Sequence, residues 1–131
     1  MSAELAELRA LRASADRLRR LVAPLDDAQL EQPAYPSEWT IADVLSHLGS
    51  GAAIGQRRLD DALTGRTPPD DFPPSVWEAW NAKSPRAKAA DALVADRELL
   101  ERMEATGEEE RDALRVSMGP LEFDFTGFVA L

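Results

Sequence analysis

Cysteine is absent from this sequence of 131 residues. A chain without cysteine cannot form a disulfide framework, bind a metal through thiolates or use a cysteine nucleophile, and it fits a reducing cytoplasm. Histidine is nearly absent, because His47 is the only one, so any histidine-based site depends on it. No apolar run approaches the roughly 20 residues that a membrane helix needs, so we expect no membrane association and a cytoplasmic location.

Basic residues are also scarce relative to acidic ones. The chain has 15 lysines and arginines against 24 aspartates and glutamates, and a formal net charge of −9. An acidic surface repels phosphate backbones and anionic lipids, which argues against nucleic acid or a membrane surface as partner. Hydrophobic residues make up 44% of the sequence, as in ordinary globular proteins. The length suits one domain, which we expect to span residues 1–131.

Three long segments carry apolar residues at steps of three and four, the pattern of an amphipathic helix. The sequence predicts helices over residues 5–22, 41–63 and 85–105. Pro24 ends the first of them. The second of these predicted helices contains His47.

Shorter elements are predicted from local signals. A cap residue followed three positions later by a side chain that can complete a capping box marks a helix start. By this pattern, or by proline in the first helical position, the predicted caps are Asp26, Thr40, Ser75 and Ser84. Residues 108–115 are highly charged and predicted to be a loop or a weak turn, with Glu108, Glu109 and Glu110 a solvated cluster. Residues 116–118 are extended at best. Residues 123–131 are rich in phenylalanine and resemble the opening of a last apolar helix.

The fold class that follows is all-α, an antiparallel four-helix bundle whose fourth helix is cut short. The last apolar segment reaches Leu131 without a glycine, proline or basic stop signal, so we expect the C-terminal part of the domain to be missing. Three long helices and a fragment would leave apolar surface uncovered. A homodimer through that open bundle face is therefore one expectation.

Three glycines follow the histidine within its predicted helix: Gly49, Gly51 and Gly55. Each costs about 1 kcal/mol relative to alanine in a helix interior, so we expect a second helix or a ligand to approach closely there. His47 lies to one side of the apolar stripe. Its position alone allows two interpretations, a partly exposed histidine on a helix flank or a metal ligand, and the first is the more common.

Two further features invite a functional interpretation. Asp96 falls on the apolar stripe of its helix, where a carboxylate is either paired with an arginine or functional, and pairing is favoured. Trp77 and Trp80 are best explained by packing in the core or against a loop. No side chain can be named as catalytic from these patterns.

Residues 39–48 read Trp-Thr-Ile-Ala-Asp-Val-Leu-Ser-His-Leu. This combination of a tryptophan, a capping box and a histidine resembles the metal-site signature of the mycothiol-dependent maleylpyruvate isomerase family, whose N-terminal domain has a DinB-like four-helix fold. The resemblance extends over nearly the whole chain and includes the late Gly119-Pro120. It implies that His47 is a ligand of a divalent metal, usually zinc, that Trp39 is a packing anchor and that Thr40 is a helix cap.

The resemblance also implies what the rest of the site would be. In the family the other protein ligands are a glutamate and a histidine four residues apart on the last helix, which would lie just beyond Leu131. The cofactor would be mycothiol, a small-molecule thiol whose thiolate adds to the double bond of maleylpyruvate, allows rotation and leaves. We therefore expect a divalent-metal-binding domain of an isomerase or thiol-transferase-like protein that acts on a small-molecule substrate. The alternative is a non-catalytic helical interaction module that has lost the metal site.

Overall fold

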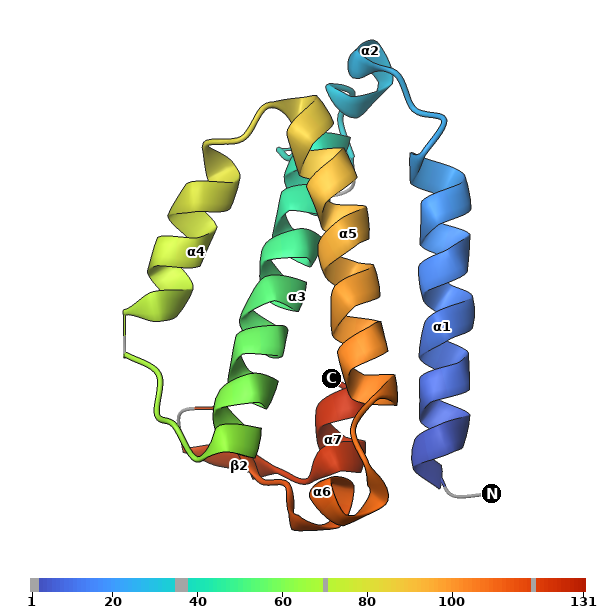
Figure 1. Ribbon diagram of the computed structural model, residues 1–131. Helices are drawn as coiled ribbons and strands as arrows, with labels where there is room; N and C mark the ends of the chain where they lie inside the picture. Colours follow the sequence, from blue (N-terminus) through green and yellow to red (C-terminus); the bar gives the residue numbers. More distant parts are fainter. Residues whose placement is uncertain (1–2, 35–37, 70, 119) are drawn as a thin grey trace.

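The computed structural model describes residues 3–34, 38–69, 71–118 and 120–131. The helices are α1 (Ala3–Val22), α2 (Asp27–Leu30), α3 (Ile41–Thr64), α4 (Phe72–Asn81), α5 (Pro85–Glu104), α6 (Glu108–Ala113) and α7 (Phe125–Val129). Two short strands, β1 (Val116–Met118) and β2 (Leu121–Phe123), form an antiparallel hairpin (Figure 1). The predicted all-α bundle and its three long helices are confirmed. None of the described helices is long and apolar enough to cross a membrane.

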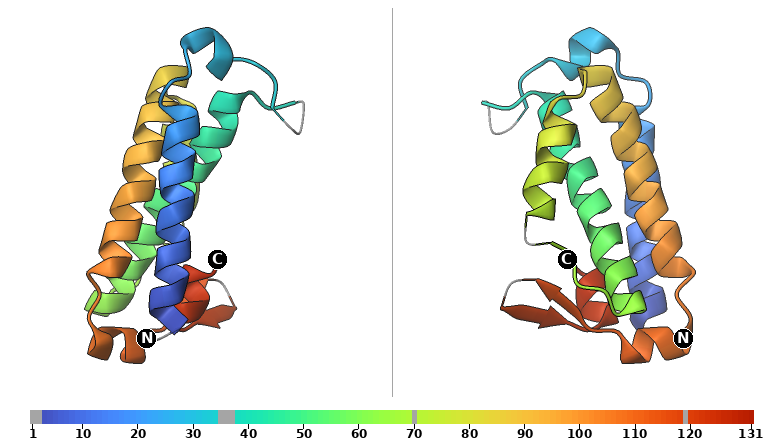
Figure 2. Two further views of the ribbon diagram at one scale, coloured as in Figure 1. Left: turned by 90° about the vertical axis from the view of Figure 1, so that its right-hand side faces the viewer. Right: turned by 60° about the vertical axis from the view of Figure 1, so that its left-hand side comes forward.

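The bundle is arranged around α3 and α5, which lie side by side, with α1 packed on α5 and α4 on α3 (Figures 1 and 2). The contacts between α3 and α5 show that these two helices run in the same direction. Gly49 meets Ala92, Gly55 meets Leu99, and the carboxylate of Asp60 accepts a hydrogen bond from Arg102 at 2.8 Å, so both sets of numbers increase together. This parallel pairing is possible because α4 returns the chain to the end of the bundle where α3 began (Figure 1). By contrast, α1 runs antiparallel to α5, and α4 runs antiparallel to α3.

The hydrophobic core has two halves along the bundle axis. The lower half in Figure 1 lies at the C-terminal ends of α3 and α5. Its buried residues are Leu8, Leu59, Leu100, Met103, Leu114, Val116, Phe125, Phe128 and Val129. The upper half is built largely from alanines around one tryptophan, and its buried residues are Val22, Leu30, Ala42, Leu45, Ala52, Trp80, Ala89, Ala92 and Ala95. Leu99 packs against both halves. Alanines leave little distance between α3 and α5 in the upper half, where the single histidine lies.

The closest contact in the upper half is at Gly49. A Cβ added there would lie 2.5 Å from Cη2 of Trp80 and 2.9 Å from Cα of Ala92, which no side chain tolerates without a shift. The expected close approach is thus confirmed at this glycine. At Gly55 an added Cβ would make ordinary contact with Leu99 at 3.4 Å. At Gly51 no atom of the described residues lies within 4 Å of the added Cβ, so no second helix approaches there.

The helix caps follow the sequence closely in three of four cases. Asp26 and Gln29 bond reciprocally, as do Thr40 and Asp43, and the Ser84 hydroxyl accepts from the backbone of α5. The prediction for Ser75 is wrong, since the cap position of α4 is Asp71, four residues earlier, and the helix begins at Phe72. The prolines that follow Phe72 occupy the first turn, where their missing N–H groups cost nothing, and the Ser75 hydroxyl donates to the Phe72 carbonyl at 2.7 Å.

The C-terminal segment differs from the prediction in two places. Residues 108–113 form α6 and not a loop, because three glutamates in a first turn interact favourably with the positive end of a helix, and Glu110 accepts from the Gly107 N–H. Phe123 lies in β2 and not in the last helix. Asp124 is extended and its carboxylate accepts from the Gly127 N–H at 2.8 Å, so α7 begins only at Phe125.

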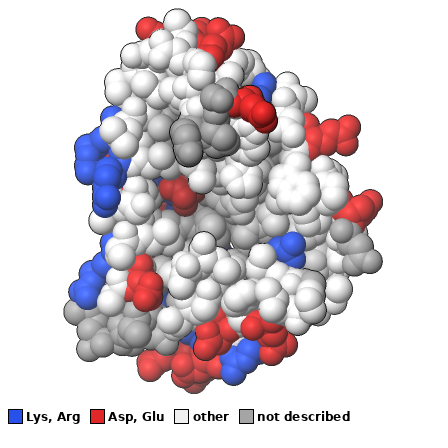
Figure 3. Space-filling view, turned by 180° about the vertical axis from the view of Figure 1, so that it is seen from behind, with Lys and Arg blue, Asp and Glu red and all other residues white. Residues whose placement is uncertain are grey.

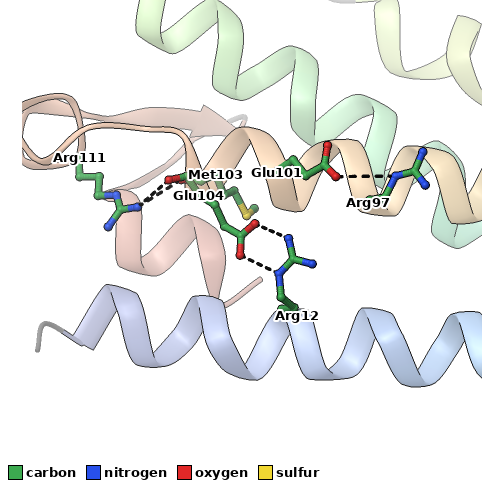
Figure 4. Close-up of polar contacts among 6 residues, drawn as sticks. All are labelled: Arg12, Arg97, Glu101, Met103, Glu104 and Arg111. Carbon is green, nitrogen blue, oxygen red and sulfur yellow. Dashed lines mark hydrogen bonds and ion pairs between the residues drawn. The ribbon is translucent and has the colours of Figure 1, made fainter.

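An exposed charge pair ties α1 to α5. Arg12 donates two hydrogen bonds to the carboxylate of Glu104, Nε to Oε2 at 2.9 Å and Nη2 to Oε1 at 2.5 Å (Figure 4). The guanidinium holds the pKa of Glu104 below its ordinary value, mainly through these hydrogen bonds. Because the pair is solvated, its stabilisation is modest, and α1 is held mainly by the apolar contacts of Leu8 and Val22.

The side of α3 that faces away from α5 is only partly covered by other elements. α7 occupies its lower end between α1 and α3 (Figures 1 and 2). Above α7 no described element covers this side of α3, where Leu48 is 46% exposed and the space beside Gly51 is open. Seen from behind, much of the surface is uncharged, with acidic side chains at the top, right and lower edges, basic side chains along the left edge and an acidic group recessed near the middle (Figure 3).

We predict that alanine substitutions at Gly49 and Gly51, two residues apart on α3, change the free energy of unfolding in opposite directions. Gly49→Ala should lower the free energy of unfolding by about 1 kcal/mol or more, because overpacking by a rigid ring and a backbone outweighs the gain in helix propensity. Gly51→Ala should raise it by about 0.5–1 kcal/mol, because the methyl group meets open space. Urea unfolding of both variants measures the two changes. A Gly49→Ala variant as stable as Gly51→Ala would contradict this packing.

Candidate functional site

One cleft, which we call the main cleft, lies beside the N-terminal half of α3, where α4 packs against it. Its volume is about 450 Å³. The lining residues come from the segment before α3, from α3 and from α4, and they are Trp39, Asp43, His47, Ser50, Trp77 and Asn81. The single histidine of the chain therefore lies in the main cleft of the bundle.

Helix geometry explains why these side chains share one cleft. Asp43, His47 and Ser50 are spaced by four and three residues, which places them on one face of α3. Trp77 and Asn81 are spaced by four and share a face of α4. The two faces meet along the cleft because Trp80, on another side of α4, is buried against Gly49.

His47 is exposed to solvent and contacts an aromatic ring. The centroids of its imidazole and the Trp39 indole are 5.7 Å apart, and the planes are inclined by 68°, an edge-to-face arrangement. We expected Trp39 to be a packing anchor, but it is 41% exposed and belongs to neither half of the core. Its indole instead forms a wall of the cleft and restricts the position of the imidazole.

Asp43 is one turn before His47, but its carboxylate is already engaged. Oδ2 accepts from the Thr40 N–H at 3.1 Å, and Oδ1 accepts from Nζ of Lys88 at 3.2 Å. The backbone hydrogen bond from Thr40, with help from Lys88, holds the pKa of Asp43 below its ordinary value. The carboxylate is therefore charged and fixed, and it anchors the start of α3 to α5.

The remaining polar groups of the cleft are held by the helices that carry them. The buried Ser46 hydroxyl donates to Oδ1 of Asn81 at 3.4 Å, which links α3 to α4 and leaves the Asn81 amide N–H groups to face a ligand. The Ser50 hydroxyl donates to the carbonyl of His47 at 3.1 Å. The cleft thus offers an imidazole, two indoles and an amide, and its one carboxylate is paired.

Within the described residues, no three histidine, cysteine or acidic side chains gather closely enough to hold a metal ion. The favoured prediction for Asp96 is wrong, since no basic side chain of the described residues lies within ion-pair distance of it. Burial raises the pKa of this half-buried carboxyl. Asp96 does not line the cleft and adds no ligand there.

Sequence reasoning missed part of this site. It assigned both tryptophans of α4 to packing, which is right for the buried Trp80 and wrong for Trp77, which is 47% exposed and lines the cleft. The four-residue spacing of Trp77 and Asn81 was a usable signal. The face of α4 that carries them could not be oriented because the start of α4 was placed four residues too late.

Comparison with known proteins identifies a family. The family described as Mycothiol maleylpyruvate isomerase N-terminal domain matches residues 11–130. No curated protein and no solved structure matches the chain. The match begins within α1 and covers every later element, including each residue that lines the cleft.

We predict that Asp43→Asn destabilises the protein in a pH-dependent way. The folded-state pKa of Asp43 is depressed, so its charged form stabilises the fold above the unfolded pKa, about 3.9, and this contribution is lost as the pH falls through the folded value. The difference in free energy of unfolding between wild type and variant should be constant near neutral pH and shrink below about pH 4. Urea unfolding across this range measures it.

Glu98→Gln is the matched control, since Glu98 is an exposed residue of α5 outside the cleft. It should change the stability by less than about 0.5 kcal/mol. A difference for Asp43→Asn that persists unchanged at pH 3, well below the range of about 4 where aspartate titrates, would show that the charge of Asp43 is not what stabilises the fold.

Proposed function

Because the chain belongs to the family of mycothiol maleylpyruvate isomerase N-terminal domains, we propose that it binds a divalent metal, preferably zinc, beside His47 in the main cleft. The whole of residues 1–131 would belong to one such domain, in a cytoplasmic protein that uses mycothiol to isomerise a small molecule or transfer a thiol to it. The observation that carries the proposal is the position of His47. The only imidazole of the chain lies exposed in the main cleft, on the residue that the family signature marks as a ligand.

The described residues supply one metal ligand and not a complete site. Zinc sites in enzymes take three protein ligands and keep one open position, and Asp43 is already bonded through both oxygens. We propose that the other ligands are a glutamate and a histidine four residues apart that follow Leu131. A spacing of four places both side chains on one helix face, so they can converge on one ion.

The packing of α7 supports the proposal that these two ligands follow Leu131. An atom added at Cβ of Gly55 would lie 3.9 Å from Cζ of Phe128, so these residues are level along the bundle axis. His47 is eight residues before Gly55, or about 12 Å along α3. A helix continued from Phe128 in the direction of α7, toward the start of α3, would pass His47 about eight residues later, about five beyond Leu131.

The residues of the chain would contribute position and environment to the reaction. Trp39 restricts the imidazole, Trp77 limits the access of water, and the Asn81 amide can donate to a carbonyl or carboxylate of a substrate. A divalent metal in such a site would lower the pKa of a thiol bound to it. The paired charges of Asp43 and Lys88 keep the start of α3 fixed while a ligand binds.

Zinc affinity measured by competition with a chromophoric chelator tests the proposal. A protein carried through the residues that follow Leu131 in the natural reading frame should bind one zinc ion tightly. His47→Ala should weaken binding by a factor of about 100 or more, since losing one of three protein ligands removes much of the binding energy. The chain that stops at Leu131 should bind zinc only weakly, because one imidazole leaves most of the coordination shell to water.

Glu98→Gln, which removes an exposed carboxylate outside the cleft, is the control and should keep the wild-type affinity. A reading frame without the glutamate and histidine pair, or an unchanged affinity in His47→Ala, would contradict the proposal. The chain would then be better described as a helical interaction module. The exposed Leu48, next to His47 on α3, would be the first residue to substitute in a test for a partner.

A further inference from the structure

A second cavity, of about 200 Å³, lies at the other end of α3. It is formed by the last turns of α3, the segment that follows and β1, and its polar lining residues are Arg58, Asp61, Arg66, Thr67, Arg115 and Ser117. Asp61 is 14 residues after His47, so the two sites are about 21 Å apart along the helix. This cavity is therefore independent of the proposed metal site.

Three arginines meet in this cavity although the chain carries a net charge of −9. The one carboxylate in the lining belongs to Asp61, which is buried and accepts from Nε of Arg57 at 2.8 Å, so its charge is compensated by an arginine outside the lining. Glu122 is opposite Ser117 in the hairpin but does not line the cavity. The local charge is thus strongly positive.

Arg58 is held in place before any ligand binds. Its guanidinium lies over the ring of Phe72, 5.3 Å from the centroid, and Nη1 donates to the Ser117 carbonyl at 3.4 Å. Nε of Arg58 is buried, and within the described residues it has no hydrogen-bond partner. A buried N–H without a partner is costly, so an acceptor at this position would be favoured.

The other two arginines are exposed and come from different segments. Arg115 donates through Nη1 to the carbonyls of Leu114, at 2.6 Å, and Asp112, at 3.4 Å, which leaves its other N–H groups for a ligand. Basic residues near the C-terminus of α3 also interact favourably with the negative end of that helix. This explains Arg66, but it does not explain Arg115, which follows α6, or the unpartnered Nε of Arg58.

We propose that this cavity binds a small, multiply charged oxyanion, either a phosphate group or a dicarboxylate, between Arg58, Arg66 and Arg115. Guanidinium groups pair with such oxyanions through two parallel N–H···O bonds, a geometry that a lysine cannot supply. Three guanidinium groups from different segments can satisfy several oxygens of one anion at once. Binding would connect the end of α3 to the hairpin.

The test is a titration of the protein with sodium phosphate and, separately, with sodium malonate, followed by the backbone amide signals of the cavity residues in NMR. Sodium chloride at matched ionic strength separates binding from screening. We expect saturable shifts with at least one oxyanion and none with chloride. Saturation by phosphate alone identifies a phosphate site, and saturation by malonate alone identifies a carboxylate site.

The variants use exposed residues, so the fold is kept. Arg66→Gln with Arg115→Gln should weaken binding by a factor of about 10 or more, since each removes charge-assisted hydrogen bonds. Arg9→Gln with Arg19→Gln makes the same change in charge on exposed residues of α1 and should leave the affinity within a factor of about two. Shifts that do not saturate, or equal weakening in both double variants, would overturn the proposal.

Discussion

The contact at Gly49 is the constraint on which the arrangement of the cleft depends. The backbone of α3 lies there against the Trp80 ring of α4 and the backbone of α5, closer than any side chain allows. Gly49 is two residues after His47, which is about 200° around the helix, so burying Gly49 turns the imidazole away from the core. The same contact fixes the angle at which α4 presents Trp77 and Asn81 to the cleft.

Charges are distributed so that the two ends of α3 have different chemistry. In the cleft the only carboxylate, that of Asp43, is neutralised by Lys88, so His47 lies among indoles and an amide. At the other end Asp61 is neutralised by Arg57, and three further arginines remain around a small cavity. In a protein with a net charge of −9, the first environment presents aromatic and amide groups and the second suits an anion.

Periodicity and caps were enough to predict the three long helices, because each has a continuous apolar stripe and a local start or stop signal. Gly49 could be predicted as a close approach, although nothing in the sequence separated it from Gly51, whose surroundings depend on tertiary packing. The start of α4 was misplaced because prolines after Phe72 resemble a loop and also fit a first helical turn. Whether Asp96 has an ion-pair partner and whether Trp77 is exposed depend on how whole helices are rotated about their axes, which no local sequence pattern reports.

The account rests on His47 as a ligand in the main cleft, and the most direct measurement is crystallographic. An anomalous difference map would be recorded at the zinc absorption edge from crystals of the protein that includes the residues after Leu131, grown with zinc. The account predicts one strong peak within about 2.0–2.1 Å of an imidazole nitrogen of His47, at the end of the ring that is open to the cleft. A peak on other residues, with the His47 ring still packed on Trp39 and no metal beside it, would contradict the account.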